Sequence, residues 1–309
     1  MGHKGLSTLN LSNRDRYQAV LIAGPTASGK SARALTIAQN IGGAIINADS
    51  MQVYADLRIL SARPAPEEER LAPHMLFGHI GAERNYSVGQ WLEDAKKAVS
   101  QARAGGLLPV MVGGTGMYFK ALLQGLSDIP AVPEEVRARV RAEGQGVAPR
   151  DLHARLAACD PEMAARLRPT DPQRIIRALE IFAATGRSLS AFQGMREKPF
   201  LDAAQCLCVF LAPEREALNR RIDARFDVMM AAGAVEEVRA LAARGLDLAL
   251  PAMRAVGVPG LAAYLRGELP LEAAVEKGKR DSRHYAKRQF TFARTQLPEF
   301  AWIDPATRD

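Results

Sequence analysis

The sequence predicts an α/β fold in which a parallel sheet core is interrupted by a helical insertion. Short apolar, β-rich runs alternate with segments of helical periodicity, a pattern typical of a parallel sheet. The strand-like runs are 19–23, 44–47, 109–112 and 206–211. Between about 129 and 200 the strand pattern disappears, and prolines punctuate helical patches instead. Because a strand-like run resumes at Cys206, we interpret this segment as an insertion.

These patterns divide the chain into three parts. Residues 1–12 are small and polar without periodicity, so we expect a flexible tail. Residues 13–128 and 201–309 should form the α/β core with C-terminal helices, and 129–200 the helical insertion domain.

Composition bounds the class of protein. The chain has 309 residues, 48% of them hydrophobic, which is enough for a sizeable core. Cys159, Cys206 and Cys208 include no CxxC pair, so we expect buried structural thiols. The first apolar run is too short to span a membrane, and residues 1–18 lack a signal-type core. We therefore expect no membrane association and a cytoplasmic location.

Basic residues concentrate near the C-terminus. Lysine and arginine number 41 against 34 acids, which gives a net charge of +7. Between Lys277 and Arg294 there are seven basic residues and one acid, Asp281. Helical spacing places Arg280, Arg283, Lys287 and Arg294 on one face. A solvated helix face is the usual interpretation of such a run, but the scarcity of acids favours an anionic partner.

The clearest motif follows the first strand directly. Its residues fit the phosphate-loop pattern GxxxxGK[ST], with a helical stretch behind it. They are Gly24, Pro25, Thr26, Ala27, Ser28, Gly29, Lys30 and Ser31. Glycines let backbone N–H groups converge on a diphosphate, and the helix N-terminus adds a favourable dipole. We expect Lys30 to supply a charge to the diphosphate and Ser31 a ligand to Mg²⁺, in a P-loop NTPase-like core.

Two further strands end in polar or glycine-rich segments. Asp49 follows the second strand and residues 113–118 follow the third, at the edge where ligands bind in open α/β sheets. Asp49 could direct a metal, act as a base for an attacking nucleophile, or cap the next helix. The three strand ends together predict a site.

Six segments in this order resemble the bacterial tRNA dimethylallyltransferases, also called tRNA isopentenyltransferases. The resemblance covers roughly residues 18–303, and its specificity lies in the order and spacing of the motifs. They are GPTASGKS, ADSMQVY, PVMVGGTGMYFKALLQGL, DPQRIIRALEIFAATG, RIDARFDVMMAAGAVEEVRAL and YAKRQFTFAR.

The resemblance implies transfer of a dimethylallyl group from dimethylallyl diphosphate, with Mg²⁺, to N6 of adenosine 37 in tRNA, releasing diphosphate. It implies that Asp49 is the general base, that Thr115 lies beside the base and that Arg225 holds the leaving pyrophosphate. It also implies a largely monomeric enzyme. Together with the basic C-terminal helix, it predicts tRNA contacts at Asp49, Ser50, Met51, Gln52, Thr115, Arg137, Gln173, Arg174, Ile175, Ile176, Arg177, Arg254, Arg280, Arg283 and Lys287.

The sequence departs from the family pattern in two places. Most relatives carry a KGxDIGTAKP-type run after the position of Tyr54, whereas this chain reads ADLRILSARP at 55–64. The usual VGYR or VGYK is Val-Gly-Val-Pro at 256–259, which removes an aromatic and a basic group. Arg254 stays a predicted RNA contact, but no contact is expected from Pro259.

Three other functions compete with tRNA prenylation. A small-molecule P-loop kinase fits the phosphate loop but has no use for the basic C-terminal helix. An adenylate isopentenyltransferase shares the chemistry but needs no RNA-gripping insertion. A non-catalytic RNA-binding protein leaves the phosphate loop unexplained.

Overall fold

A computed structural model describes residues 16–192 and 197–306, so the predicted tail at 1–12 lies outside the described residues. The chain forms two compact units. The first extends to Leu123 and resumes at Pro199, and the second is Gln124–Lys198. This second unit is bounded differently from the predicted insertion at 129–200. Its entry and exit segments are joined, because the backbone N–H of Glu197 donates to the carbonyl of Leu126 at 2.9 Å.

The first unit is built on a six-stranded sheet in which every pairing is parallel, with the order β3-β2-β4-β1-β5-β6. The strands are β1 (Ala19–Ala23), β2 (Gly43–Asn47), β3 (His74–Met75), β4 (Leu108–Gly113), β5 (Cys206–Leu211) and β6 (Ala301–Ile303). The predicted parallel α/β core is confirmed. Sequence periodicity did not predict β3 and β6, which are too short to show alternation.

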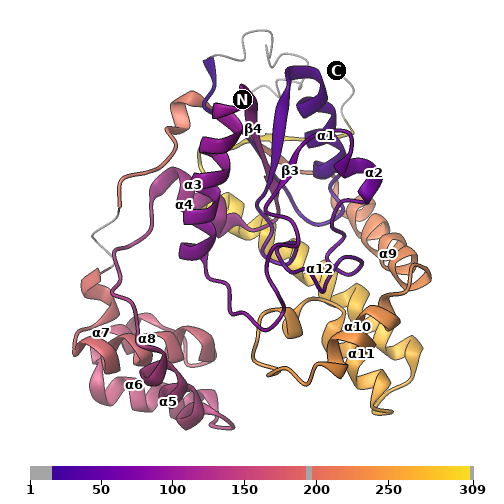
Figure 1. Cartoon of the computed structure of the whole chain (residues 1–309). Helices are drawn as coiled ribbons and strands as arrows, with labels where there is room; N and C mark the ends of the chain where they lie inside the picture. The colour runs from indigo at the N-terminus through magenta and orange to yellow at the C-terminus, as the bar shows by residue number, and fades with distance from the viewer. Residues whose placement is uncertain (1–15, 193–196, 307–309) are drawn as a thin grey trace. The chain divides into compact units, whose positions relative to one another are not determined.

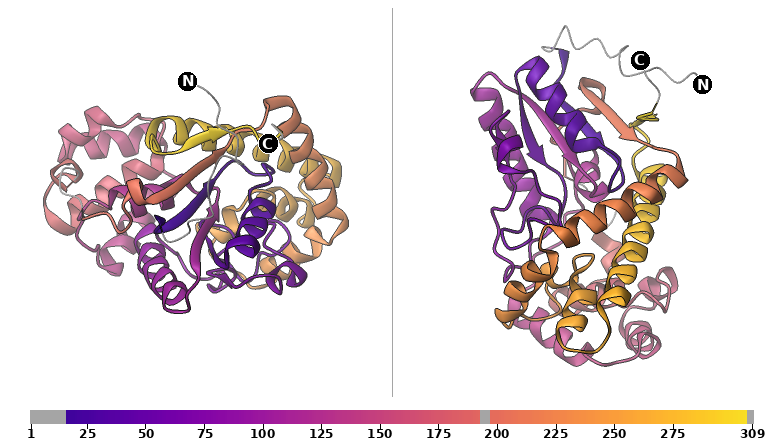
Figure 2. Two further views of the ribbon diagram at one scale, coloured as in Figure 1. Left: turned by 90° about the horizontal axis from the view of Figure 1, so that it is seen from above. Right: turned by 90° about the vertical axis from the view of Figure 1, so that its right-hand side faces the viewer.

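Helices cover both faces of the sheet, which gives the layers seen in Figure 2. On one face, α1 (Lys30–Ile41) packs Ala34, Ile37 and Ala38 against strand residues such as Val20 and Val110. α3 (Val88–Ala104) and α4 (Gly116–Gln124) meet through Trp91 and Tyr118, whose parallel rings lie 3.9 Å apart. Both aromatic side chains are buried, so this stack ties the two helices together.

The C-terminal part of the first unit is helical, and its longest helix, α12 (Leu271–Gln296), lies beside α9 (Arg215–Ala231), as Figures 1 and 2 show. Where the two helices cross, a Cβ at Gly278 would lie 2.1 Å from the ring of Phe226, so only glycine fits there. The remaining helices of this unit are α2 (Pro66–Glu69), η4 (Ala203–Gln205), α10 (Ala234–Ala243), η5 (Ala252–Arg254) and α11 (Val258–Leu265).

The second unit is helical, as the sequence predicted, and α5–α8 bundle together in Figure 1. Its elements are α5 (Glu134–Gly144), α6 (Pro149–Cys159), α7 (Pro161–Arg166), α8 (Pro172–Thr185) and η3 (Leu189–Phe192). Prolines stand at the first turns of α6, α7 and α8, where a missing N–H costs little. Leu156, Ile175 and Ile181 are fully buried in a core of its own.

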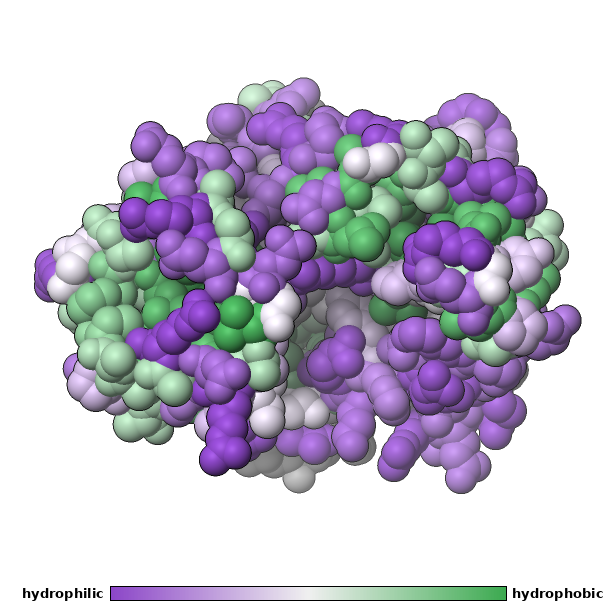
Figure 3. Space-filling view, turned by 90° about the horizontal axis from the view of Figure 1, so that it is seen from below, coloured by the Kyte–Doolittle hydropathy of each residue, from purple (hydrophilic) through white to green (hydrophobic). Residues whose placement is uncertain are grey.

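The helices, the surface and the three cysteines can be compared with the expectations drawn from composition. None of the helices in the described ranges is both long and apolar enough to cross a bilayer. Hydrophilic side chains cover much of the face in Figure 3, and the hydrophobic ones form separate patches. Cys206 and Cys208 are buried on β5, and burial raises the pKa of Cys206 to about 11. Cys159 is only half-buried, against expectation, because it ends α6 at the unit's surface.

Leu156→Ala should destabilise the second unit by about 2–5 kcal/mol, because it removes a fully buried side chain and leaves a cavity. Amide hydrogen exchange read separately for residues 124–192 and for the sheet measures this loss. The exposed Leu248 provides a control, since Leu248→Ala should leave both exchange patterns unchanged. Equal loss of protection in both units after Leu156→Ala would contradict a separate core.

Candidate functional site

Three neighbouring strands deliver the predicted site residues to one edge of the sheet. β2, β4 and β1 are adjacent and parallel, and Ala23 lies opposite Gly113 while Asn47 lies opposite Val112. The segments that follow, 24–29, 48–52 and 114–118, therefore leave the sheet side by side. This juxtaposition depends on strand order, which no motif contains by itself.

The phosphate loop has the backbone geometry that its glycines predict. Gly29 has φ 85°, in the left-handed region, and begins α1 with open space around its absent Cβ. Ala27 also takes a positive φ of 61°, which is strained for a residue with a side chain. A Cβ at Gly24 would lie 2.8 Å from the Oγ of Ser28, so the loop closes only with glycine there.

Lys30 is the buried cation of this loop. It opens α1 with 8% of its surface exposed, and its Nζ donates to the carbonyl of Pro25 at 3.2 Å. Burial lowers the pKa of the ammonium to about 8, although nearby Asp49 opposes the shift, and Arg225 adds to the lowering. At neutral pH this ammonium is still mostly charged, and an anionic ligand would stabilise the charge that burial disfavours, which suits a phosphate.

Arg225 brings a second cation to the loop from α9. Its Nη1 lies 3.5 Å from the Oγ1 of Thr26. Burial lowers the pKa of the guanidinium and the carboxylate of Asp49 opposes this, so the charges of Arg225, Lys30 and Asp49 act on one another. The buried Lys30 and the half-buried Arg225, with one carboxylate between them, leave a surplus of positive charge, which an anionic ligand would neutralise.

Asp49 is fixed by hydrogen bonds from both sides. Its N–H donates to the Oδ1 of Asn47 at 2.8 Å, and its own Oδ1 accepts from the N–H of Met51 at 3.0 Å. Asn47 is fully buried, and its Nδ2 donates to the carbonyls of Asp49 and Leu76. The carboxylate is thus held by one oxygen, while Oδ2 has no hydrogen-bond partner within 16–192 and 197–306.

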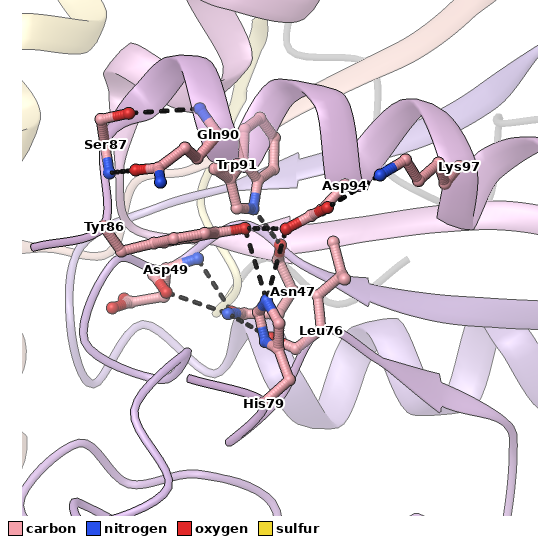
Figure 4. Close-up of polar contacts among 10 residues, drawn as sticks. All are labelled: Asn47, Asp49, Leu76, His79, Tyr86, Ser87, Gln90, Trp91, Asp94 and Lys97. Atoms are coloured by element: carbon pink, nitrogen blue, oxygen red, sulfur yellow. Dashed lines mark hydrogen bonds and ion pairs between the residues drawn. The ribbon is translucent and has the colours of Figure 1, made fainter. Parts of the chain in front are cut away.

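Figure 4 shows what supports Asn47 in turn. The Nε1 of Trp91 donates to the carbonyl of Asn47 at 3.0 Å. Trp91 is placed by a capping box at the start of α3, in which Ser87 and Gln90 exchange side-chain and backbone hydrogen bonds. A local sequence signal therefore helps to position Asp49, which lies two contacts away.

A second polar group in Figure 4 lies along the same helix. Tyr86 donates its hydroxyl to the Oδ2 of Asp94 at 2.7 Å, and the Nε2 of His79 lies 3.3 Å from that hydroxyl. Burial lowers the pKa of His79, and the carboxylate of Asp94 opposes the shift. These contacts fix the chain between β3 and α3.

Thr115 joins the segments after β2 and β4. Its Oγ1 accepts from the N–H of Ser50 at 2.9 Å and donates to the Oγ of Ser50 at 3.1 Å. Tyr285 of α12 lies near Thr115, and burial raises the pKa of its phenol. The hydroxyls of the segments that follow β2 and β4 are thus hydrogen-bonded to each other, with the phenol of Tyr285 close by.

Sequence reasoning missed two residues of α12, Tyr285 and Gln289. Gln289 is buried and contacts both the phosphate loop and Gly114. A signal was present, since Gln289 stands between Ala286 and Ala293 on a buried face of small residues. A polar side chain in such a stripe needs hydrogen-bond partners, and here the site provides them.

Two of the predicted tRNA contacts need correction. Ile175 is fully buried in the core of the second unit, so its side chain serves packing. Gln52 is also buried, and its Nε2 donates to the carbonyls of Ser61 and Ala62 at 3.0 and 2.9 Å. Family motifs mark both positions, but motif matching does not distinguish a contact from its support. Ser50 and Met51 are half-buried.

The basic helix α12 is less uniform than its sequence indicates. Arg283 forms an ion pair with Asp223 of α9, so this predicted RNA contact already has an acidic partner in the fold. Lys277 pairs with Asp281, and Lys279 with Asp227. Arg280 and Lys287 are exposed and form no ion pair within the described part of the chain. Acids from α9 reduce the basic face, which the run alone could not reveal.

In the second unit, the predicted contacts gather at the start of α8. Gln173 and Arg174 are exposed, and Ile176 and Arg177 are half-buried. Arg177 pairs with the buried Glu180 at 3.2 Å, which Arg141 also contacts at 2.8 Å. Arg137 pairs with Glu134 at 2.7 Å.

The segment 55–64, whose sequence differs from the family pattern, is hydrogen-bonded to α10. One carboxylate, that of Glu237, accepts from the backbone N–H groups of Arg58, Ile59 and Leu60, at 2.7, 2.7 and 2.9 Å. The loop is therefore ordered despite its unusual sequence.

Arg254 of η5 is exposed, and Pro259 lies in the first turn of α11, where its missing N–H is tolerated.

Metal ligands are sparse around the loop. The described residues contain no group of three His, Cys, Asp or Glu side chains that could hold an ion. Ser31 is exposed next to Lys30 and offers a hydroxyl oxygen. Such a donor set fits Mg²⁺ held largely by water and by a ligand's phosphate oxygens, as this ion prefers.

Comparison with known proteins identifies relatives along most of the chain. A family profile described as IPP transferase matches residues 52–296, and one described as isopentenyl transferase matches 17–73. The tRNA dimethylallyltransferase of Methylocella silvestris is 62% identical, covering 94% of this chain and 96% of its own. That of Beijerinckia indica is 60% identical, covering 93% and 95%.

Solved structures agree with these relatives. A full-length tRNA isopentenylpyrophosphate transferase from Bacillus halodurans matches with a TM-score of 0.66 and 34% identity, over 93% of this chain and 89% of that one. A eukaryotic dimethylallyltransferase acting on tRNA matches with a TM-score of 0.77 and 26% identity, over 93% and 73%.

Binding of inorganic pyrophosphate should weaken as the pH rises above about 8. Below this pH the ammonium of Lys30 is charged before the anion arrives, whereas above it a proton must be taken up. Calorimetric titrations of wild type and Lys30→Met at several pH values separate this effect from ionisation of pyrophosphate itself. Wild type should bind about 10- to 100-fold more tightly near pH 7. If the ratio of wild-type to Lys30→Met affinity does not decrease above pH 8, the pKa of Lys30 is not lowered.

Proposed function

The chain belongs to the IPP transferase family, as its motifs predicted, and we propose that it transfers a dimethylallyl group from dimethylallyl diphosphate to N6 of adenosine 37 in tRNA. The observation that carries this proposal is one cluster of side chains that contains both cations and a carboxylate. Lys30 is buried and Arg225 half-buried at the phosphate loop, and their charges interact with the fixed carboxylate of Asp49. One half suits a departing diphosphate, and the other a nucleophile that loses a proton.

The reaction forms a bond between N6 and the first carbon of the allyl group, while the bond from that carbon to the diphosphate oxygen breaks. Oδ2 of Asp49 accepts the proton that N6 loses. The negative charge that develops on pyrophosphate is stabilised by Lys30, by Arg225 and by N–H groups of the loop. Because these donors are already in place, they need little rearrangement during the reaction.

Mg²⁺ belongs to this proposal as the cofactor. When bound, it would neutralise charge on the diphosphate, with Ser31 as its protein ligand. The N–H groups at the start of α1 and the side chain of Lys30 would bind the same oxygens.

The acceptor in this proposal is the anticodon loop of tRNA. Thr115 and Ser50 would position the base beside Asp49, since their hydroxyls are mutually hydrogen-bonded. Arg280, Lys287 and Arg254 offer exposed cations, and Gln173 and Arg174 offer exposed donors in the second unit. We place the reaction in the cytoplasm and assign it to a monomer, as the resemblance to the family implies.

One assay decides between this activity and its rivals. Dimethylallyl diphosphate and unmodified tRNA are supplied together, and the digested nucleosides are analysed by mass for prenylated adenosine. AMP as the alternative acceptor tests an adenylate isopentenyltransferase, and ATP consumption tests a kinase. Release of ADP without any mass increase on adenosine would overturn the proposal.

Asp49→Asn should lower the single-turnover rate of prenyl transfer by about 10²- to 10⁴-fold, because it removes a positioned proton acceptor. The asparagine Oδ1 can still accept from the N–H of Met51, so the segment should keep its shape and tRNA affinity should hold. A rapid-quench assay with enzyme in excess measures the rate, and filter binding measures affinity. A decrease of less than tenfold would reassign Asp49 to a structural role.

Arg280→Ala combined with Lys287→Ala should weaken tRNA binding and flatten its salt dependence. For each phosphate that is no longer neutralised, the slope of log affinity against log salt should become shallower by about 0.7 to 0.9. Filter binding at several salt concentrations gives this slope, and affinity for dimethylallyl diphosphate should not change. Lys97→Ala on α3 is the control for removal of a surface charge. If the slope does not change, α12 is a solvated surface.

A further inference from the structure

Gln289 is buried between the two halves of the site. It lies in the C-terminal half of α12 with 6% of its surface exposed. Its Oε1 accepts from the N–H of Thr26 in the phosphate loop at 2.9 Å, and its Nε2 donates to the carbonyl of Gly114 at 2.8 Å. One side chain thus spans the segments that follow β1 and β4.

The orientation of this amide follows from its partners. A backbone N–H can only donate and a carbonyl can only accept, so the oxygen must face Thr26 and the nitrogen must face Gly114. Both ends of the amide are therefore used. No other side chain of this size and shape offers an acceptor and a donor at these two places.

Gly114 makes room for this arrangement. A Cβ on Gly114 would lie 2.1 Å from the Nε2 of Gln289, and 3.2 Å from the Oδ2 of Asp49. The same position thus approaches both the amide and the carboxylate oxygen that carries the proposed proton transfer. The glycine is required by these contacts, since any side chain would displace the amide.

We propose that Gln289 is a positioning residue that sets the separation between the diphosphate loop and the carboxylate of Asp49. This inference rests on the proposed function and adds to it a residue that need not touch either substrate. Transfer requires the allylic carbon, held through its diphosphate by the loop, to meet an amine held beside Asp49. A misplacement of about 1 Å between such groups can cost about 10²-fold in rate.

Gln289→Met tests the role without removing bulk. Methionine has a similar length but neither donates nor accepts strongly, so the N–H of Thr26 and the carbonyl of Gly114 lose their partner. Single-turnover transfer should fall about 10- to 100-fold, while the dissociation constant for tRNA stays within about threefold. Thr291→Ala, on an exposed position of the same helix, should match wild type. Transfer by Gln289→Met at the wild-type rate would overturn the proposal.

A double-mutant cycle with Gly114 separates positioning from packing. Gly114→Ala should slow transfer in the wild-type background, because the new methyl group expels the amide. In the Gln289→Ala background the methyl group enters vacated space and meets only Oδ2 of Asp49, so Gly114→Ala should slow transfer much less than it does in wild type. Such non-additivity is the signature of a shared contact. Independent, multiplying effects would show that the amide does not act through Gly114.

A measurement of pyrophosphate binding tests this inference independently of the proposed function. If wild type transfers no prenyl group to tRNA, the proposed function fails, yet the loop can still be examined by calorimetry. Gln289→Met should then bind pyrophosphate several-fold more weakly than wild type, because Thr26 is no longer held. Equal affinities would overturn the inference on its own, and unchanged thermal unfolding would exclude misfolding as the cause of a decrease.

Discussion

The placement of a buried lysine and a half-buried arginine beside one carboxylate is the constraint on which the rest of the site depends. Lys30 and Arg225 lose hydration that Asp49 only partly replaces, and the lowered pKa of each records that cost. Charges so placed remain together only if the surrounding backbone holds them. The fold provides this through adjacent parallel strands, each of which ends at the same edge of the sheet. An anionic ligand then supplies the charge that the protein lacks.

Supporting contacts account for more of the site than the residues proposed to react. Asp49 is held by Asn47, which is held by Trp91, and Trp91 is placed by the capping box of α3. Thr115 and Ser50 form a hydrogen-bonded pair on the other side, and Gln289 connects this region with the phosphate loop. Because each contact fixes the next, small changes far from the reacting atoms should alter rate more than binding.

The helix α12 combines two tasks on different faces. Its small buried residues allow close packing against α9, and Tyr285 and Gln289 reach the site from that side. Its outer face carries Arg280 and Lys287. Acids on α9 form ion pairs with Arg283 and Lys279 of the basic run. The positive charge available to RNA is therefore smaller than the number of basic residues in the run suggests. In the proposed function, one helix therefore both supports the site and presents cations to RNA.

The sequence by itself determined the parallel α/β core, the helical insertion, the phosphate loop and the family. These depend on local periodicity and on motifs whose residues lie within a few positions of one another. The tertiary structure alone decided the strand order, the short strands β3 and β6, and the partners of Arg283, Gln52 and Ile175. It also brought Gln289 to Thr26, which is 263 residues away. Such contacts arise from packing between distant segments, and no local pattern in a single sequence encodes which segments meet.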